Sequence, residues 1–238
     1  MERSEDDEAE SEDRKAPPLG VSCSMQCSRS AHALQVVIVS HNCQRKAATQ
    51  ALTLASSQAL CDSVDTAAIA ITCMQEPLQV HVTSNTAASQ WCHAAQRTVR
   101  YLGCERDDWS SFALCADTYV PYHIQILNVH LNPRPWPQPG HRRREDLAAV
   151  VSEVSPHIVA GDFNELRGGP CDQWLRMQRY VELTQAITDP TWYSQTEASQ
   201  NIDRIYCRTD LLPHVAYASA IGHTFGSDHA RVICRITD

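Results

Sequence analysis

The stretch IVAGDFNE at residues 158–165 is an apolar run that leads into a glycine, and Asp162 and Asn164 then stand on either side of a phenylalanine. A run of this kind is typical of a short strand that is covered on both faces. A carboxylate and a carboxamide are costly to bury without hydrogen-bond partners. The stretch therefore predicts a buried strand that ends at a polar site.

The same pattern recurs along the chain. Other short β-branched runs with polar residues at or near one end occupy 34–42, 66–76, 122–132, 201–208 and 226–236. Helical spacing of apolar residues predicts helices over 44–60, 142–154 and 171–183. The proline cluster at 132–140 indicates a surface loop, and the alanine- and cysteine-rich stretch 85–118 stays unassigned. Alternating strands and helices predict an α/β layered domain.

Composition limits the class of protein. With 238 residues, 43% of them hydrophobic, and a formal charge of -8, we expect one globular core, and a monomer. The first fifteen residues hold eight acidic and three basic side chains, so we expect residues 1–33 to form a disordered tail before a domain at 34–238. Without a signal-like or membrane-spanning segment, we expect an intracellular protein, cytoplasmic or nuclear. The eleven scattered cysteines indicate reduced, half-buried thiols.

Polar residues at a single strand end have an ordinary explanation, because a lone carboxylate there is more often a turn former or a helix cap. Here, however, several successive strands deliver Asn, Glu, His or Asp near one end. Packed strands place such residues around a shared edge, where open α/β folds bind ligands. The joint pattern therefore predicts one polar site.

Six short motifs carry a resemblance to a known family. In chain order they are SHN at 40–42, MQE at 74–76, NVHL at 128–131, GDFN at 161–164, NIDRI at 201–205 and SDHARV at 227–232. Together they resemble the endonuclease/exonuclease/phosphatase superfamily, which includes abasic-site endonucleases, deoxyribonuclease I, inositol-polyphosphate 5-phosphatases and retroelement endonucleases. The resemblance implies the four-layer α/β/β/α sandwich of the deoxyribonuclease I-like type, with mixed sheets flanked by helices.

The resemblance also implies roles for individual residues. The expected cofactor is Mg²⁺, with Mn²⁺ as a substitute, and the residues that match its ligands are Glu76, Asn42 and Asp228. Such a metal site needs oxygen ligands. The residues that match catalytic positions are His130, Asp162, Asn164, Asp203 and His229. Asp162 would orient or deprotonate the attacking water, and Asp203 would favour the imidazolium form of His229.

Substrate contacts are expected from Asn132, Arg204, Arg142 and Arg143. The last two lie in HRRRED at 141–146, which is typical of a nucleic-acid-binding patch but also of the solvated first turn of a helix. Glu145 and Asp146 follow at once and favour the second interpretation.

The resemblance implies a Mg²⁺-dependent phosphoester hydrolase, with a nucleic-acid phosphodiester as the first substrate class and a small inositol or lipid phosphate ester as the second. Trp192 lies eleven residues before Asp203, which matches the 5-phosphatase pattern only in part. Zinc-assisted hydrolysis is disfavoured, since the chain has no HExxH helix motif. Two other interpretations stay open: an inactive member that serves as a binding module, and a disused remnant of a mobile element.

Overall fold

The computed structural model describes residues 35–62, 68–76, 90–93, 98–103, 110–116, 124–133, 139–196, 198–214 and 216–237. All of them belong to the compact unit Ala31–Asp238. The acidic tail that the sequence predicts at 1–33 lies outside the described residues.

One mixed sheet has β1 near its centre. In spatial order it contains β10 (Ala216–Ile221), β11 (Val232–Thr237), β1 (Gln35–Asn42), β2 (Ala68–Gln75) and β3 (Gln90–His93). β1 and β2 are parallel, whereas the other neighbours are antiparallel. The helix α1 (Ala47–Asp62) connects the two parallel strands, as a crossover between parallel strands requires.

The second mixed sheet contains, in spatial order, β4 (Thr98–Gly103), β5 (Ser111–Ala116), β6 (Gln125–His130), β7 (Ile158–Asp162), β9 (Asp203–Arg208) and β8 (Tyr180–Glu182). β6 and β7 are its parallel pair, and α2 (Pro139–Val154) connects them. A third helix, α3 (Pro170–Met177), follows β7, and a 3₁₀ turn at Leu212–His214 follows β9.

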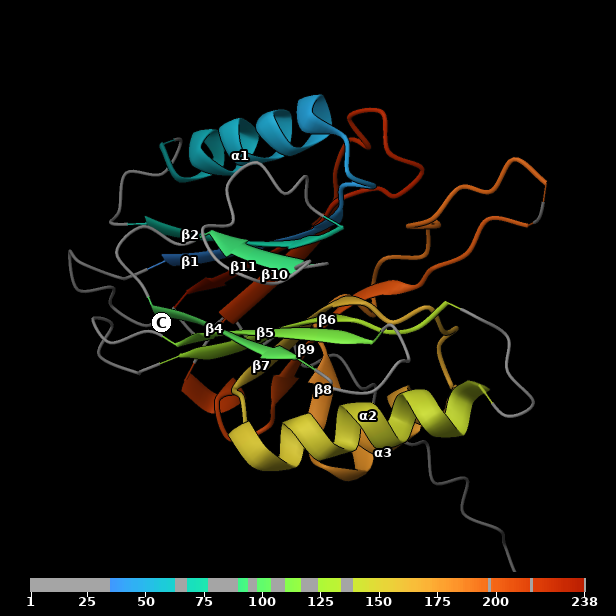
Figure 1. The fold of residues 1–238 in the computed structure, drawn as a ribbon. Coiled ribbons are helices and arrows are strands. Elements are labelled where there is room, and N and C mark those ends of the chain that lie inside the picture. Colours follow the sequence, from blue (N-terminus) through green and yellow to red (C-terminus); the bar gives the residue numbers. More distant parts are fainter. Residues whose placement is uncertain are drawn as a thin grey trace, which may run out of the picture. The chain divides into compact units, whose positions relative to one another are not determined.

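The helices lie on the outer faces of the two sheets. In Figure 1, α1 covers the first sheet, while α2 and α3 cover the second, and the sheets face one another. This arrangement confirms the predicted four-layer α/β/β/α sandwich. Within the described part of the chain, no helix combines the length and the apolar character that a membrane span needs.

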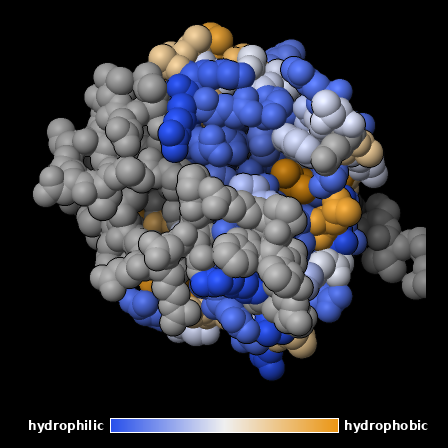
Figure 2. Space-filling model, turned by 45° about the vertical axis from the view of Figure 1, so that its right-hand side comes forward, coloured by the Kyte–Doolittle hydropathy of each residue, from blue (hydrophilic) through white to orange (hydrophobic). Residues whose placement is uncertain are grey.

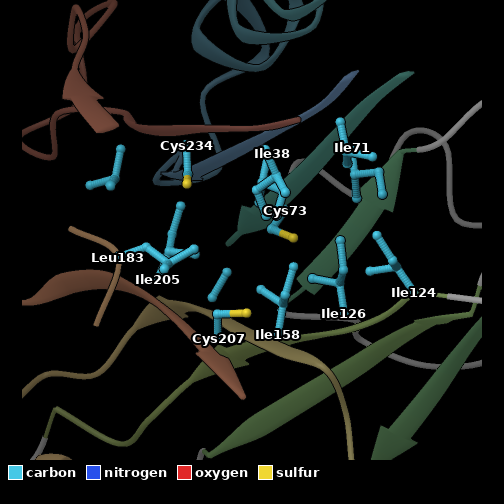
Figure 3. Close-up of a cluster of buried hydrophobic side chains, with 14 of the residues drawn as sticks. Ile38, Ile71, Cys73, Ile124, Ile126, Ile158, Leu183, Ile205, Cys207 and Cys234 are labelled. Atoms are coloured by element: carbon cyan, nitrogen blue, oxygen red, sulfur yellow. The ribbon is translucent and has the colours of Figure 1, made fainter. Parts of the chain in front are cut away.

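The main core fills the space between the two sheets. Figure 3 shows Ile38 and Ile71 from the first sheet facing Ile126, Ile158 and Ile205 from the second. A second apolar cluster lies under α2 and α3 and includes Leu147, Phe163 and Tyr206. Strands such as β1 and β7 are thus buried on both faces, which explains their near-continuous apolar sequences.

The core also explains where the polar strand ends point. Side chains alternate along a strand, so the row Ile158, Ala160 that faces the opposite sheet continues to Asp162. Asn42, His130, Asp162 and Asp203 each continue a row of inter-sheet core residues in this way. His130, Asp162 and Asp203 are register partners across β6, β7 and β9. The alternation therefore brings these side chains to one end of the space between the sheets.

The structure differs from the sequence prediction at several elements. The third helix ends at Met177 instead of 183, because Arg179 has a positive φ of 64° and the chain then forms β8. Pro139 and Gly140 belong to α2 and not to a loop, since proline is tolerated in the first helical turn; residues 134–138 lie outside the described ranges. The unassigned stretch 85–118 contains β3, β4 and β5.

The cysteines whose side chains are described are free thiols, as predicted, but they are fully buried instead of half-buried. Cys43, Cys73, Cys171, Cys207 and Cys234 are buried and free. Burial raises the pKa of the Cys43, Cys207 and Cys234 thiols to about 12, so these groups behave as small apolar residues.

Candidate active site

Asp162 is the centre of the polar cluster. Its side chain is 1% exposed, and its Oδ2 accepts a hydrogen bond of 3.2 Å from Nδ2 of Asn42. The Nε2 atoms of His130 and His229 lie 3.9 Å and 3.8 Å from the same oxygen. Oδ1 accepts a bond of 2.8 Å from the backbone N–H of Asn164. Four of the residues predicted from the sequence thus surround one carboxylate.

The turn after β7 fixes this carboxylate. Gly161 has a φ of 148°, and a Cβ atom there would lie 1.9 Å from the carbonyl oxygen of Val129 on β6. Only glycine allows the two strands to approach this closely. Asn164 has a positive φ of 47°, and its Nδ2 donates to the Leu131 carbonyl over 2.7 Å. Backbone geometry that is unusual for non-glycine residues is typical of functional sites.

His229 lies between three carboxylates. Nδ1 is 3.0 Å from Oδ2 of Asp203, while Nε2 faces Asp162 and lies 3.6 Å from Oδ1 of Asp228. Burial opposes a charge on the imidazole, but Asp203, Asp162 and Asp228 outweigh it and raise the pKa of His229 to about 9. Burial also raises the pKa of Asp203. The two groups compete for one proton, and the imidazole holds it because two further carboxylates stabilise its charge.

Buried neighbours hold this pair in place. His41, whose pKa burial lowers to about 4, donates from Nε2 to the carbonyl of His229 at 3.0 Å. Its Nδ1 pairs with the Thr53 hydroxyl at 2.7 Å. The Thr191 hydroxyl accepts hydrogen bonds from the backbone N–H groups of Ile202 and Asp203 at 3.0 Å and 2.9 Å. The backbone on both sides of the pair is therefore fixed by buried hydrogen bonds.

The predicted metal ligands lie around the same cluster. Glu76, with a positive φ of 48° and a side chain 34% exposed, has its Oε1 atom 3.6 Å from Nε2 of His130. Oδ2 of Asp228 accepts a 3.2 Å bond from the indole N–H of Trp192, and Oδ1 is buried without a hydrogen-bond partner among the described residues. Oδ1 of Asn42 accepts one bond, from the backbone N–H of Gln44, and keeps a lone pair.

Asp162, Asp203 and His229 form a second group whose ligand atoms lie within 4.8 Å of one another. Metal binding requires a neutral imidazole, whereas these carboxylates favour the imidazolium form. These ligand atoms could hold a metal ion, and an ion there would have to displace the proton that His229 and Asp203 share in their 3.0 Å hydrogen bond. The oxygen atoms of Glu76, Asn42 and Asp228 suit a hard cation such as Mg²⁺.

The expected substrate contact of Arg204 needs correction. Neighbouring residues of a strand face opposite sides, so Arg204 points away from Asp203 into the core under α3, where it is fully buried. Its guanidinium donates to the Glu165 carbonyl and to the Tyr206 hydroxyl and lies 4.9 Å from the centre of the Phe163 ring. Arg204 thus supports the 163–165 turn from the side of the sheet that faces α3.

The other expected substrate contacts, Arg143, Arg142 and Asn132, differ in their exposure to solvent and in their hydrogen bonds. Arg143 is half-buried and donates to the carbonyls of Asn132 and Asn164, so it connects the two loops beside Asp162. Arg142 is exposed on α2. Asn132 is buried, and its backbone N–H donates to Ser110. Arg143 therefore connects these loops in the structure, and its phosphate contact stays a prediction.

Sequence reasoning missed several residues of the site. Trp192 was considered only for its spacing from Asp203, but its indole holds Asp228. His41 lies within the SHN motif and points to the other face of β1 from Asn42. Asn128 and Gln75 are joined by a buried hydrogen bond of 2.6 Å between the two sheets. The sequence did indicate Gln75 and Asn128, because both are polar residues near the end of an apolar strand.

Figure 2 turns the right-hand side of Figure 1 toward the viewer and shows the face near the end of β1 and the start of α1. The described surface on this face is mainly hydrophilic, with a small hydrophobic area. A charged or polar ligand suits such a surface better than an apolar one.

Comparisons with known proteins give structural matches alone. No family model and no curated protein sequence matches the chain. Among solved structures, the endonuclease domain of TRAS1, a telomere-specific non-LTR retrotransposon, matches with a TM-score of 0.61 and 16% identity, over 84% of this chain and 98% of that one. A humanized D. rerio TDP2 matches with a TM-score of 0.57 and 16% identity, over 85% and 98%.

An endonuclease/exonuclease/phosphatase family protein from Bacteroides thetaiotaomicron matches with a TM-score of 0.55 and 13% identity, over 87% of this chain and 98% of that one. Identities at this level establish the fold and not the activity. The chain therefore has the fold of the endonuclease/exonuclease/phosphatase proteins.

Proposed function

We propose that the chain is a metal-dependent phosphoester hydrolase that cleaves nucleic-acid phosphodiesters. The observation that carries this proposal is the convergence of Asn42, His130, Asn164 and His229 on the buried carboxylate of Asp162. Buried titratable groups that cluster around one carboxylate in this way are typical of catalytic sites.

Glu76, Asn42 and Asp228 would hold the metal ion, and Mg²⁺ is our first choice. The buried Oδ1 of Asp228 and the half-exposed carboxylate of Glu76 fit such an ion, because both lack a close hydrogen-bond donor among the described residues. When bound, the ion would neutralise phosphate oxygens and stabilise the leaving oxygen.

The remaining residues would act on water and phosphate. Asp162 would orient the attacking water and accept its proton, since its two oxygens are held by Asn42 and by the backbone of Asn164. His229, held as an imidazolium by Asp203, would donate from Nε2 to a phosphate oxygen. His130 would provide a second donor.

Nucleic acid is our preferred substrate class for two reasons. An endonuclease is among the proteins that share the fold, and this chain spans 98% of that domain. The described face near the site is mainly hydrophilic and offers little apolar surface to a lipid tail.

The test is an activity panel with Mg²⁺ or EDTA, on plain and abasic duplex DNA, single-stranded DNA, RNA and inositol phosphates. We expect metal-dependent cleavage of at least one nucleic acid, and a loss of about 10²- to 10³-fold or more in Asp162→Ala and Glu76→Ala. Cleavage that is equal in the parent and both variants would overturn the mechanism. Cleavage of inositol phosphates alone would move the substrate to the small phosphate esters.

A further inference from the structure

The turn between β1 and α1 has an unusual backbone. Gln44 and Arg45 are consecutive residues with positive φ angles of 50° and 55°. Left-handed backbone is unfavourable for a long side chain and is adopted freely by glycine. A non-glycine residue in this conformation points to a functional constraint where the turn lies at a site.

This turn is attached directly to the candidate metal ligands. The backbone N–H of Arg45 donates to the carbonyl of Glu76 over 2.7 Å, and that of Cys43 donates to Gln75 over 2.9 Å. Asn42 lies immediately before the turn, and its Oδ1 accepts from the backbone of Gln44. Arg45 is therefore fixed at the rim of the site through its own backbone.

The side chains of the turn have different partners. Lys46 donates from Nζ to Oε1 of Gln44 at 2.9 Å and to the carbonyl of Gly226 at 2.6 Å, so its ammonium is engaged. Arg45 is exposed, and its guanidinium has no hydrogen bond or ion pair with any described residue. The turn thus uses one cation for structure and leaves the other available.

The negative charge of the site favours a cation at its rim. Glu76, Asp162, Asp203 and Asp228 contribute four carboxylates to the site. A bound metal ion would neutralise part of this charge, and a cation at the rim would add to the attraction of a polyanionic substrate. A guanidinium is suited to this task because its planar fork binds phosphate oxygens in pairs.

We infer that Arg45 binds a backbone phosphate of the nucleic acid next to the scissile phosphate. This inference rests on the proposed function, and it adds Arg45 to the residues that are expected to contact the substrate.

The experiment measures binding and its salt dependence. Asp162→Asn is the background, so that a fluorescent oligonucleotide is bound with Mg²⁺ present but cleaved slowly. Arg45→Gly removes the charge and suits the positive φ, while Arg45→Lys keeps the charge. Arg179→Gly is the matched control, because Arg179 is also exposed with a φ of 64° but lies in the turn before β8, next to Thr209 beyond the far end of β9.

We expect Arg45→Gly to weaken binding about 3- to 10-fold at low salt and to reduce the slope of log Kd against log salt concentration by about 0.9 on duplex DNA, or about 0.7 on a single strand. Arg45→Lys should retain the slope, and Arg179→Gly should match the background in both affinity and slope. The thermal midpoint of Arg45→Gly should not fall, which separates a lost contact from a damaged fold.

An unchanged slope in Arg45→Gly would overturn the inference while leaving the proposed function intact, provided that the parent cleaves nucleic acid. An equal loss of slope in Arg179→Gly would also overturn it, because the effect would then reflect net charge. If the parent does not cleave or bind any nucleic acid, the proposed function itself fails.

Discussion

The Nδ1 atom of His229 lies 3.0 Å from a carboxylate oxygen of Asp203, and both side chains are almost completely buried. The other ring nitrogen faces Asp162 and Asp228. An imidazole in this position is stabilised as a cation, and the pKa of His229 rises to about 9. The site therefore holds a positive charge where a phosphate would bind.

This charge predicts the alkaline limit of activity. If the imidazolium binds the phosphate, kcat/KM should fall as the pH rises through about 9. Asp203→Asn removes the main stabilising charge, so the pKa of His229 should fall toward its ordinary value of 6.5, and the alkaline limit should move to lower pH. The pH profile of kcat/KM for parent and variant is the measurement. An alkaline limit at the same pH in both proteins would contradict the assignment.

The same shift affects stability. A histidine whose folded pKa is raised contributes stability that is complete below pH 6.5 and is lost as the pH rises through about 9. In EDTA, urea unfolding should therefore show a steeper loss of stability over this range in the parent than in Asp203→Asn. Equal pH dependence in the two proteins would mean that Asp203 does not hold the proton on His229.

Trp192 should control the affinity of the metal site. Its indole N–H donates to Oδ2 of Asp228 and leaves the buried Oδ1 for an ion. Trp192→Phe removes this hydrogen bond and keeps an aromatic ring, so the Mg²⁺ concentration for half-maximal activity should rise about tenfold or more. Tyr193→Phe is the control, because it keeps the backbone N–H of Tyr193, which donates to the carbonyl of Asp228. An unchanged Mg²⁺ requirement in Trp192→Phe would show that Trp192 does not control the affinity of the metal site.

Much of the site could be predicted because it follows from two simple patterns. Strands buried on both faces have apolar sequences, and polar residues at their ends stand out against them, as Asp162 and Asn164 do. Arg204 was misplaced, although alternation along β9 puts it on the opposite face from Asp203. The role of Trp192 depends on a contact with Asp228, 36 residues away, which no local pattern contains.

Helices and strands were harder to predict where the sequence shows little contrast between apolar and polar residues. The stretch 85–118 is rich in alanine and cysteine, which are compatible with both buried and exposed positions. Neither a strand period nor a helix period therefore stands out in its sequence. At α3 the helical pattern continues past Met177 into Tyr180, and only the left-handed Arg179 ends it. A residue other than glycine gives little sign of that conformation in the sequence.

Arg204 should be required for stability and not for substrate affinity. It is fully buried and donates to the Glu165 carbonyl and the Tyr206 hydroxyl. Arg204→Lys cannot make both bonds from one planar group, so the free energy of unfolding should fall by about 2 kcal/mol or more. Urea unfolding measures this loss. If Arg204→Lys kept full stability and raised KM alone, Arg204 would contact substrate as the sequence had suggested.

Gly161 should be the most sensitive position of the turn that holds Asp162. A Cβ atom there would lie 1.9 Å from the Val129 carbonyl oxygen, and the φ of 148° is open to glycine alone. Gly161→Ala should therefore separate β7 from β6 and cost about 3 kcal/mol or more. Gly168→Ala is the matched control, because Gly168 also has a positive φ, of 80°, but has no atom within 4 Å of the added Cβ. It should cost about 1 kcal/mol and leave activity near the parent value. Urea unfolding and activity on the same preparations separate the two variants, and equal stability in both would show that β6 and β7 do not approach as closely as this structure has them.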